Sequence, residues 1–204
     1  MFYETSSNAH GLPHDPFKAI VTPRPIGWIT AMSARGEINL SPYSFFNAIG
    51  ERPPMVAFSS AGRKDAITFI EETKEFVCNL ATYDLREKMN ATSAALPRGV
   101  SEMDHAGLAA APSRLVKPPR VAEAAAALEC RWLQTVPLVP LEGGEPSYSL
   151  VIGQVVGIHI DDRYIVNGIV DTAAMRPIAR SGYRDYFVAT PETKFSMTRP
   201  GGAG

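Results

Sequence analysis

Residues 26–33 read Ile-Gly-Trp-Ile-Thr-Ala-Met-Ser, and Arg35-Gly36-Glu37 then lead into Ile38-Asn39-Leu40. β-Branched and aromatic residues, which favour the pleated backbone of a strand, dominate the first of these segments. A glycine between two apolar segments is typical of a tight turn. This stretch therefore predicts a β-hairpin, and the segments on either side of it predict more short strands.

Apolar segments downstream of the hairpin predict buried strands at residues 55–60 and 76–81. The second half of the chain predicts two longer strands. One begins at Leu128, although the alanines at 124–127 favour a helix by propensity. The other, residues 148–160, alternates between two faces. One face is expected to carry Ile152, Val156, Ile158 and Ile160, and the other Gly153, Val155, Gly157 and His159.

Three short helices are expected between these strands. The first covers residues 65–72, with Asp65 as N-cap and the apolar Ala66, Phe69 and Ile70 on one face. The second begins at Asp84, with Glu87 as its capping-box partner, and ends near Thr92. The third covers residues 171–175 and is closed by Pro177.

Length and composition indicate one globular domain over residues 1–204. The chain has 204 residues, of which 45% are hydrophobic and 20% charged, and this composition can form an ordinary core. Residues 1–16 are polar and contain helix breakers, so they predict an N-terminal arm, and residues 197–204 predict a flexible tail. Many short strands and few short helices favour a mainly β protein, an antiparallel barrel or sandwich.

Charge and motifs argue against several functional classes. The chain has 20 basic and 21 acidic residues and a net charge of −1, so we expect neither nucleic acid nor a membrane surface as partner. Neither Gly-x-Gly-x-x-Gly nor Gly-x-x-x-x-Gly-Lys-Ser/Thr occurs, so a nucleotide would be bound by other means. His10 and His14 are separated by Gly11 and Pro13, so no metal site is expected there.

The two cysteines and the N-terminus predict a cellular location. Cys78 and Cys130 lie in apolar segments and are expected to be reduced, structural thiols. The first residues lack a secretory signal, and the longest apolar segment, residues 150–160, is too short to span a membrane. We therefore expect a soluble, cytoplasmic protein.

Residues 59–68, Ser-Ser-Ala-Gly-Arg-Lys-Asp-Ala-Ile-Thr, lead from a predicted strand through a glycine turn into a predicted helix. Free N–H groups and the positive end of the helix dipole favour an anion at such a position. Ser59 and Ser60 add hydroxyl donors, and Arg63 and Lys64 add charge for a phosphate. The alternative is a solvated loop, in which Asp65 itself caps the helix.

Residues 39–47, Asn-Leu-Ser-Pro-Tyr-Ser-Phe-Phe-Asn, combine hydroxyl, amide and aromatic groups beside a strand end. Aromatic faces, with Ser44 and Asn47 as polar partners, suit a flat heteroaromatic ligand. The alternative is an aromatic core beside a polar turn. His159 leaves a similar choice open, since it is either a core histidine or a group that contacts a ligand.

These segments together resemble the flavin reductase-like family of FMN-binding split-barrel proteins, and the resemblance covers about residues 13–187. It is carried by the order and spacing of 22–30 (Thr-Pro-Arg-Pro-Ile-Gly-Trp-Ile-Thr), 39–47, Pro53-Pro54-Met55-Val56, Lys64-Asp65, 75–80 (Glu-Phe-Val-Cys-Asn-Leu), Leu128-Glu129-Cys130, 153–159 and 176–180 (Arg-Pro-Ile-Ala-Arg). It implies a mainly β fold, an antiparallel, Greek-key-like split barrel with a few short helices.

The resemblance also implies a cofactor and its contacts. FMN would be bound without a covalent link near the interface of a homodimer, with NADH or NADPH as electron donor. The residues implied to bind the cofactor are Thr30, Ala31, Met32, Ser44, Asn47, Ser59, Ser60, Arg63, Lys64, Thr68 and Arg180. His159 is implied to lie near the nicotinamide and flavin as the catalytic residue, positioning the rings or supplying a proton at flavin N1.

Three functions are compatible with an FMN-binding split barrel. The first is an NAD(P)H:flavin oxidoreductase that supplies reduced flavin to a monooxygenase partner. The second is an electron carrier with tightly bound FMN, similar to flavoredoxin, and the third is a non-catalytic flavin-binding module. The extra length at residues 96–119 and at the termini is expected to cover the site at which flavin and nicotinamide exchange, which favours the carrier.

Overall fold

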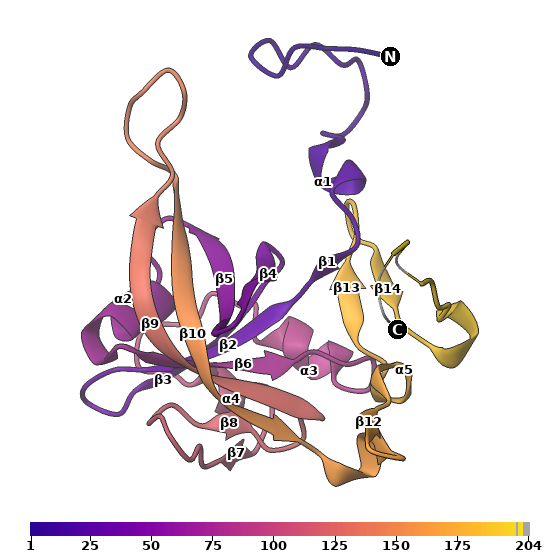
Figure 1. The fold of residues 1–204 in the computed structure, drawn as a ribbon. Helices are drawn as coiled ribbons and strands as arrows, with labels where there is room; N and C mark the ends of the chain where they lie inside the picture. The colour runs from indigo at the N-terminus through magenta and orange to yellow at the C-terminus, as the bar shows by residue number, and fades with distance from the viewer. Residues whose placement is uncertain (199, 202–204) are drawn as a thin grey trace.

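The computed structural model describes residues 1–198 and 200–201. Its centre is a seven-stranded antiparallel sheet with the strand order β3-β2-β6-β9-β10-β5-β4. The sheet curves around a core, as Figure 1 shows, and the predicted mainly β barrel is confirmed. Its strands are β2 (Gly27–Met32), β3 (Ile38–Tyr43), β4 (Phe46–Glu51), β5 (Pro54–Ala61), β6 (Glu75–Leu80), β9 (Ala126–Pro137) and β10 (Tyr148–Ile160).

Smaller sheets and short helices surround this barrel. One sheet contains β1 (Arg24–Pro25), β13 (Ile178–Arg180) and β14 (Tyr186–Val188), and two-stranded sheets pair β7 (Ala110–Ala111) with β8 (Arg120–Val121) and β11 (Ile165–Val166) with β12 (Ile169–Val170). The helices are α1 (Phe17–Ile20), α2 (Asp65–Thr73), α3 (Arg86–Ala91), α4 (Glu102–His105) and α5 (Thr172–Met175), with 3-10 turns at Asp162–Tyr164 and Pro191–Thr193.

The main core lies between helix α2 and the inner face of the sheet. Ala66, Ile67, Phe69 and Ile70 of α2 are buried, as expected from their spacing on one helical face. They pack in one cluster with Phe58 and Phe76, whose rings lie 6.0 Å apart at a steep angle. Burial of large aromatic side chains contributes much of a core's stability. The position of α2 is therefore fixed, and with it the loop that precedes the helix.

A second core lies beneath α3 and α4, on another side of the sheet. Trp28 of β2 is fully buried there, together with Leu40, Met89 and Met103. The Trp28 indole N–H donates to the Thr92 hydroxyl at 2.9 Å, which satisfies its one polar group. Strand β2 is therefore covered on both faces, which explains its nearly continuous apolar sequence.

Strand β10 departs from strict alternation because it contains a β-bulge. Val155 pairs with Cys130 of β9, and Gly157 pairs with Glu129, so the register shifts between the two pairs. Paired residues share a face of the sheet, and neighbours along β9 face opposite ways. Val155 thus belongs to the main core, whereas Gly157 and His159 face the other side. The prediction that Val155 and His159 share a face is wrong, because the bulge adds one residue.

Two of the expected element starts are also corrected. Helix α3 begins at Arg86 rather than at Asp84, because the Asp84 carboxylate accepts from Arg176 at 2.9 Å instead of capping the helix. Strand β9 begins at Ala126, two residues before Leu128, because pairing with β10 outweighs the helix propensity of alanine. The expected flexible tail, residues 197–204, lies partly outside the described residues.

Two other expectations are confirmed, the cap of α5 and the burial of the cysteines. Asp171 caps α5 by accepting from the Ala174 N–H at 3.2 Å. Cys78 and Cys130 are buried free thiols. Burial raises the pKa of the Cys78 thiol well above its usual range. Within the described ranges, no helix has the length and apolar character needed to cross a membrane.

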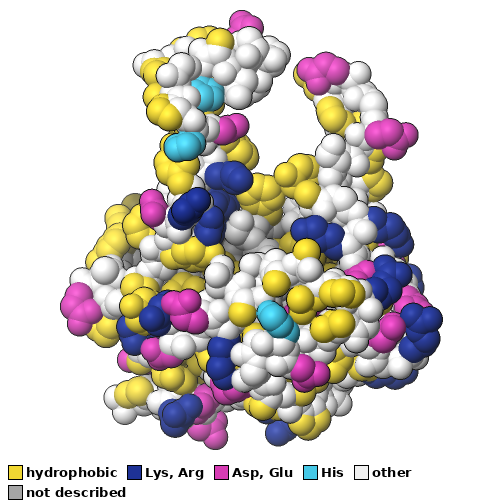
Figure 2. All heavy atoms as spheres, turned by 180° about the vertical axis from the view of Figure 1, so that it is seen from behind, with side chains coloured by type: hydrophobic (Ala, Val, Ile, Leu, Met, Phe, Trp, Pro, Cys, Tyr) yellow, Lys and Arg dark blue, Asp and Glu magenta, His cyan; other side chains and the backbone are white. Residues whose placement is uncertain are grey.

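Two segments extend away from the barrel. Residues 1–16 lead to α1 and are almost entirely exposed, and the loop 138–147 joins β9 to β10. Figure 2 shows these as two projections with open space between them. Exposed apolar side chains occur on both, with Phe2 at 89% and Leu141 at 97% exposure. Residues 1–16 thus pack little against the rest of the chain.

Gly153→Ala is expected to lower the free energy of unfolding by about 1–3 kcal/mol, because overpacking a filled core forces its neighbours to move. A Cβ atom at Gly153 would lie only 2.4 Å from Cζ of Phe76. Urea unfolding followed by tryptophan fluorescence measures the change. Gln154→Ala is the matched control, since Gln154 is the next residue of β10 and is only half-buried. Equal stability of the Gly153→Ala variant and the wild type would contradict this packing.

Candidate functional site

Three clefts lie in a row, the first beside β3, β5 and the start of α2, and the other two beside the small β1-β13-β14 sheet. We call them the loop cleft (about 540 Å³), the central cleft (about 910 Å³) and the aromatic cleft (about 420 Å³). The loop and central clefts share Pro42, Ser44 and Ser93. The central and aromatic clefts share five lining residues: Met89, Asn90, Arg180, Arg184 and Tyr186. The three therefore form one continuous depression.

The loop cleft gathers most of the residues predicted to bind a phosphate. Ser59 and Ser60 come from the end of β5, Lys64 from the start of α2, and Ser44 from the turn between β3 and β4. Strand β5 pairs with both β4 and β10, and this pairing fixes the end of β5 beside the helix. Hydroxyl donors and one ammonium group thus converge on one cleft, which is the chemistry of an anion site.

The N-terminus of α2 opens onto this cleft. Lys64 occupies the N-cap position, and within the described residues no side chain caps the helix. The first N–H groups of α2 are therefore free of a capping oxygen, and the helix dipole favours an anion beside them. Asp65 is not the cap, as the alternative interpretation required. Its carboxylate accepts instead from Arg98 Nε at 2.9 Å, and this ion pair neutralises a negative charge at the cleft.

Two buried hydroxyls, Ser60 Oγ and Tyr43 Oη, lie among the groups that line the loop cleft. They are neighbours, but neither reaches hydrogen-bond geometry with any described residue. Burial raises the pKa of Tyr43 to about 12, so the phenol keeps its proton at neutral pH. Glu102, the other acid of this cleft, is held by the Asn39 amide at 2.8 Å and the Leu40 N–H at 3.0 Å.

The central cleft is basic. Its lining includes the cations Lys18, Arg24, Arg180 and Arg184, against the carboxylates Asp15 and Asp185. Arg24 is buried, and its guanidinium donates to the carbonyls of Val21 and Ser181, the latter at 2.8 Å. Burial, together with the nearby Arg180, lowers the pKa of Arg24. Arg180 itself stacks 4.5 Å from the Tyr186 ring, so the predicted Arg180 does reach the depression.

Other predicted contacts do not line any of the three clefts. Thr30 and Ala31 are fully buried, and the Thr30 hydroxyl accepts from the Asn79 amide at 2.9 Å. Arg63 pairs with Glu71 at 2.5 Å. Three more residues belong to this group. Met32 is half-buried, and the Asn47 side chain accepts from the Ala48 N–H. The Thr68 hydroxyl donates to the Lys64 carbonyl. Within one chain the structure does not bring these residues to the depression.

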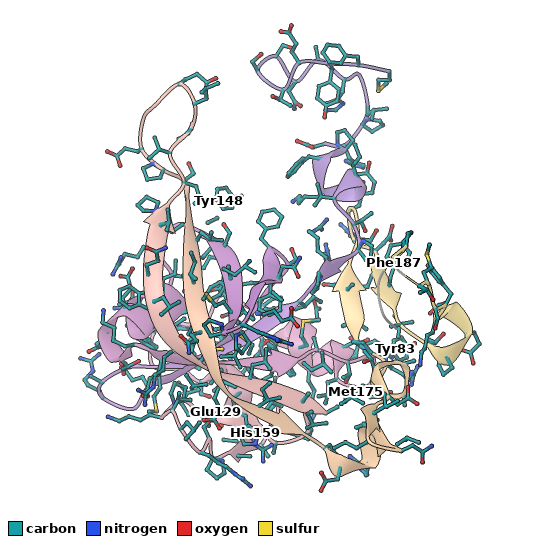
Figure 3. All side chains as sticks on the ribbon, in the orientation of Figure 1. Tyr83, Glu129, Tyr148, His159, Met175 and Phe187 are labelled. Carbon is teal, nitrogen blue, oxygen red and sulfur yellow. The ribbon has the colours of Figure 1, made fainter. Side chains whose placement is uncertain are left out.

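His159 lies apart from the clefts, on the far face of β10. Its Nε2 atom is 2.5 Å from Oε1 of Glu129, a fully buried carboxylate. Figure 3 shows the two side chains together, away from Tyr83 and Phe187 beside β13 and β14. The bulge in β10 turns His159 toward Glu129, and this position favours the packing alternative over the ligand-contact alternative. Catalysis by His159 stays a prediction that no contact within one chain supports.

The Glu129 carboxylate also holds part of the extra segment. It accepts from the N–H groups of Arg114, Leu115 and Val116, at 2.7, 2.6 and 3.2 Å. Burial disfavours the charged form, but the bonds from His159 and from these N–H groups outweigh it, and the pKa of Glu129 is lowered. The segment 96–119 is therefore divided: Leu96 lines the loop cleft, and residues 114–116 pack at the far face.

Sequence reasoning missed several lining residues. Tyr43 lies inside a segment that was singled out, but nothing in the sequence signals that its hydroxyl would be buried without a partner. Ser93 lies in an irregular segment without a periodic pattern. The partner of Asp65, Arg98, lies 33 residues away in sequence, and a contact over that distance leaves no local signal. Tyr183 and Arg184, in the sequence Gly-Tyr-Arg-Asp, showed only a cluster of turn and charged residues.

Comparisons with known proteins agree with this architecture. The family model described as Flavin reductase like domain matches residues 20–169. An uncharacterized protein of Aquifex aeolicus is 33% identical over 184 residues, which cover 87% of this chain and 90% of that protein. The crystal structure of nitrilotriacetate monooxygenase component B from Bacillus cereus is similar, with a TM-score of 0.85 and 27% identity over 97% of this chain and 98% of that one.

A further solved structure shares the fold. It is 2-nitrobenzoate 2-nitroreductase NbaA of Pseudomonas fluorescens, with a TM-score of 0.84 and 24% identity over 97% of this chain and 96% of that one. The two solved structures cover nearly the whole chain, whereas the family model ends at residue 169, before strands β13 and β14.

Proposed function

Because the chain belongs to the flavin reductase-like family, we propose that it is an oxidoreductase that binds FMN and transfers a hydride from NADH or NADPH to the flavin. The convergence of Ser44, Ser59, Ser60 and Lys64 on the loop cleft carries the proposal. These residues come from two parts of the chain, the turn between β3 and β4 and the segment 59–68, and together they supply the donors that a phosphate monoester requires. A solvated loop would not require Ser44 to lie beside Ser59, Ser60 and Lys64.

The residues of the loop cleft fit the phosphate of FMN. The uncapped N-terminus of α2, the Lys64 ammonium and the buried Ser60 hydroxyl are donors without a described acceptor in the cleft. The nearby acids do not oppose an anion, because Asp65 is paired with Arg98 and Glu102 with Asn39. The cleft continues past Ser44 into the larger central cleft, which has room for a fused ring system.

We assign roles to this chain's own residues accordingly. Lys64 and Ser59 bind the phosphate, and Ser44, at the junction of the two clefts, orients the ring. Arg180, at the wall of the central cleft, would place a positive charge beside a bound ring and so favour negative charge on it. FMN itself supplies the redox chemistry when bound, since its ring accepts a hydride. The protein's contribution is to hold two rings at contact distance, for which no acid or base is strictly required.

We further propose that the protein acts as a homodimer. The N-terminal arm and the 138–147 loop expose Phe2, Val139 and Leu141, and they project from the barrel with open space between them (Figure 2). Exposed apolar groups on two projections are typical of segments that pack on another chain. A second copy of this chain would bury them. The name of the similar Bacillus cereus protein, a monooxygenase component, supports a monooxygenase as the user of the reduced flavin.

The proposal is tested by steady-state oxidation of NADH and NADPH in the presence of added FMN. We expect consumption of at least one nicotinamide well above the rate in buffer, and visible bleaching of protein-bound FMN on adding that donor. Absence of turnover with both donors would reject the oxidoreductase. A purified protein that is yellow but idle with both would instead support the electron carrier, and a protein that fails to quench FMN fluorescence would reject every flavin-based function.

A further inference from the structure

The aromatic cleft lies beyond the central cleft, at the end farthest along the row from the loop cleft. Three aromatic side chains line it, Tyr83, Tyr186 and Phe187, over a floor that includes Ile178 and Met89. Figure 3 shows Tyr83 and Phe187 beside the small sheet, on the side of the molecule away from His159. An apolar cleft of about 420 Å³ with aromatic walls suits a flat heteroaromatic ring.

Two of these rings already have cationic partners, and the third does not. Arg86 and Arg176 lie 4.0 and 4.4 Å from the centre of the Tyr83 ring, and Arg180 lies 4.5 Å from that of Tyr186. Phe187 is 54% exposed and has no aromatic or cationic neighbour among the described residues. The Phe187 ring is therefore the surface on which a flat base can stack.

The charges at this cleft favour an anion beside that base. Its lining holds the cations Arg86, Arg180 and Arg184 against one carboxylate, Glu87. Glu87 lies 3.5 Å from Arg86, and Arg180 donates to the Tyr183 carbonyl. Arg184 is exposed and makes neither an ion pair nor a side-chain hydrogen bond with any described residue. It stands at the junction of the aromatic and central clefts, so its guanidinium is free to bind a phosphate.

The order of the clefts matches a dinucleotide. A molecule with its reactive ring in the central cleft and an adenine on Phe187 would pass Arg184 at the adenosine ribose. An unphosphorylated ribose offers hydroxyls there, which are best recognised by a carboxylate, whereas a 2′-phosphate is best recognised by an arginine. The one carboxylate of the aromatic cleft already has Arg86 as its partner.

We propose that the aromatic cleft binds the adenosine 2′-phosphate end of NADPH, with adenine on Phe187 and the 2′-phosphate on Arg184. This inference names the electron donor for the flavin site proposed above. The role of NADPH in turnover rests on that proposed function. Binding of the adenosine fragment does not depend on flavin, so the two can be tested apart.

The test compares two fragments, 2′,5′-ADP and 5′-AMP, by isothermal titration calorimetry with the full chain. We expect 2′,5′-ADP to bind at least about tenfold more tightly, as one additional charge-assisted phosphate contact provides. Arg184→Ala should remove that preference while leaving 5′-AMP nearly unchanged, whereas Phe187→Ala should weaken both ligands alike. Arg163→Ala is the matched control, because Arg163 is exposed but already paired with Asp161 outside the clefts.

Equal affinities for the two fragments, undetectable binding of both at millimolar concentration, or an unchanged preference in Arg184→Ala would each overturn the inference. FMN titration of the same samples separates the proposals. If FMN binds but 2′,5′-ADP does not, the flavin function stands and the NADPH site fails. If 2′,5′-ADP binds with the expected preference but FMN does not, the nucleotide site stands and the flavin function fails.

Discussion

Lys64→Ala should weaken FMN binding by about ten- to a hundredfold and change the affinity for riboflavin by less than about twofold, because only FMN carries a phosphate. Lys64 is the one described ammonium that lines the loop cleft, and it stands at the N-terminus of α2. The expected loss corresponds to one hydrogen bond to a charged group. Quenching of flavin fluorescence measures both dissociation constants on the same samples.

A matched substitution tests whether the position or merely the charge is responsible. Lys117→Ala removes another exposed ammonium, from the segment held at the far face, and it should leave both affinities unchanged. Lys64→Arg should retain most of the FMN affinity, since it keeps the positive charge. Equal losses for FMN and riboflavin in Lys64→Ala would show that the loop is an ordinary solvated turn and that the phosphate lies elsewhere.

The largest effect on stability is expected for Glu129→Ala, which should lower the free energy of unfolding by about 3–5 kcal/mol, as removal of one partner from a buried charged network does. The substitution leaves three backbone N–H groups at 114–116 and the His159 ring without their acceptor. For a chain of this length the loss corresponds to a fall in melting temperature of about 6–20 °C. Differential scanning calorimetry measures it.

The same network predicts how stability depends on pH. The pKa of Glu129 is lower in the folded protein than in the unfolded chain, so its contribution is fully present above the unfolded value of about 4.3. That contribution is lost as the pH falls through the lower, folded pKa. Glu129→Gln should flatten the acid limb of the stability curve, because glutamine does not titrate.

His159→Ala should reduce stability without changing FMN affinity. A selective loss of turnover in this variant would instead show that His159 takes part in the reaction.

Local patterns predicted most of the barrel correctly, because hairpin, strand and helix signals lie within short windows. Strand β10 was placed at Tyr148–Ile160, and its bounds agree with the structure. Its second half was assigned to the wrong face, since a β-bulge depends on the partner strand and leaves no mark in period-two alternation. That single residue accounts for the position of His159.

The candidate site was predicted where its residues are close in sequence and missed where they are not. Ser59, Ser60 and Lys64 come from one strand–turn–helix segment, so the chemistry of the segment identified them. Tyr43 lines the cleft, and Arg98 pairs with Asp65 beside it, through tertiary contacts that the sequence does not show. Thr30 points inward, where its hydroxyl accepts from the buried Asn79 amide. Arg63 is a similar case. Its guanidinium donates to Glu71, eight residues further along the chain, and this pairing was not evident from the segment alone.

The extra residue in β10 has a consequence for how reliably the strands find their alignment. Val155, before the bulge, packs in the main core with Phe76, whereas Val156, at the bulge, packs against Val77, Val116 and Ala127. If β10 shifted by one residue against its partner strands, any burial gained on one side of the bulge would be lost on the other. Neither shifted register is therefore favoured. The bulge interrupts the ladder of hydrogen bonds, and it thereby disfavours mispaired forms of β10, the longest described strand.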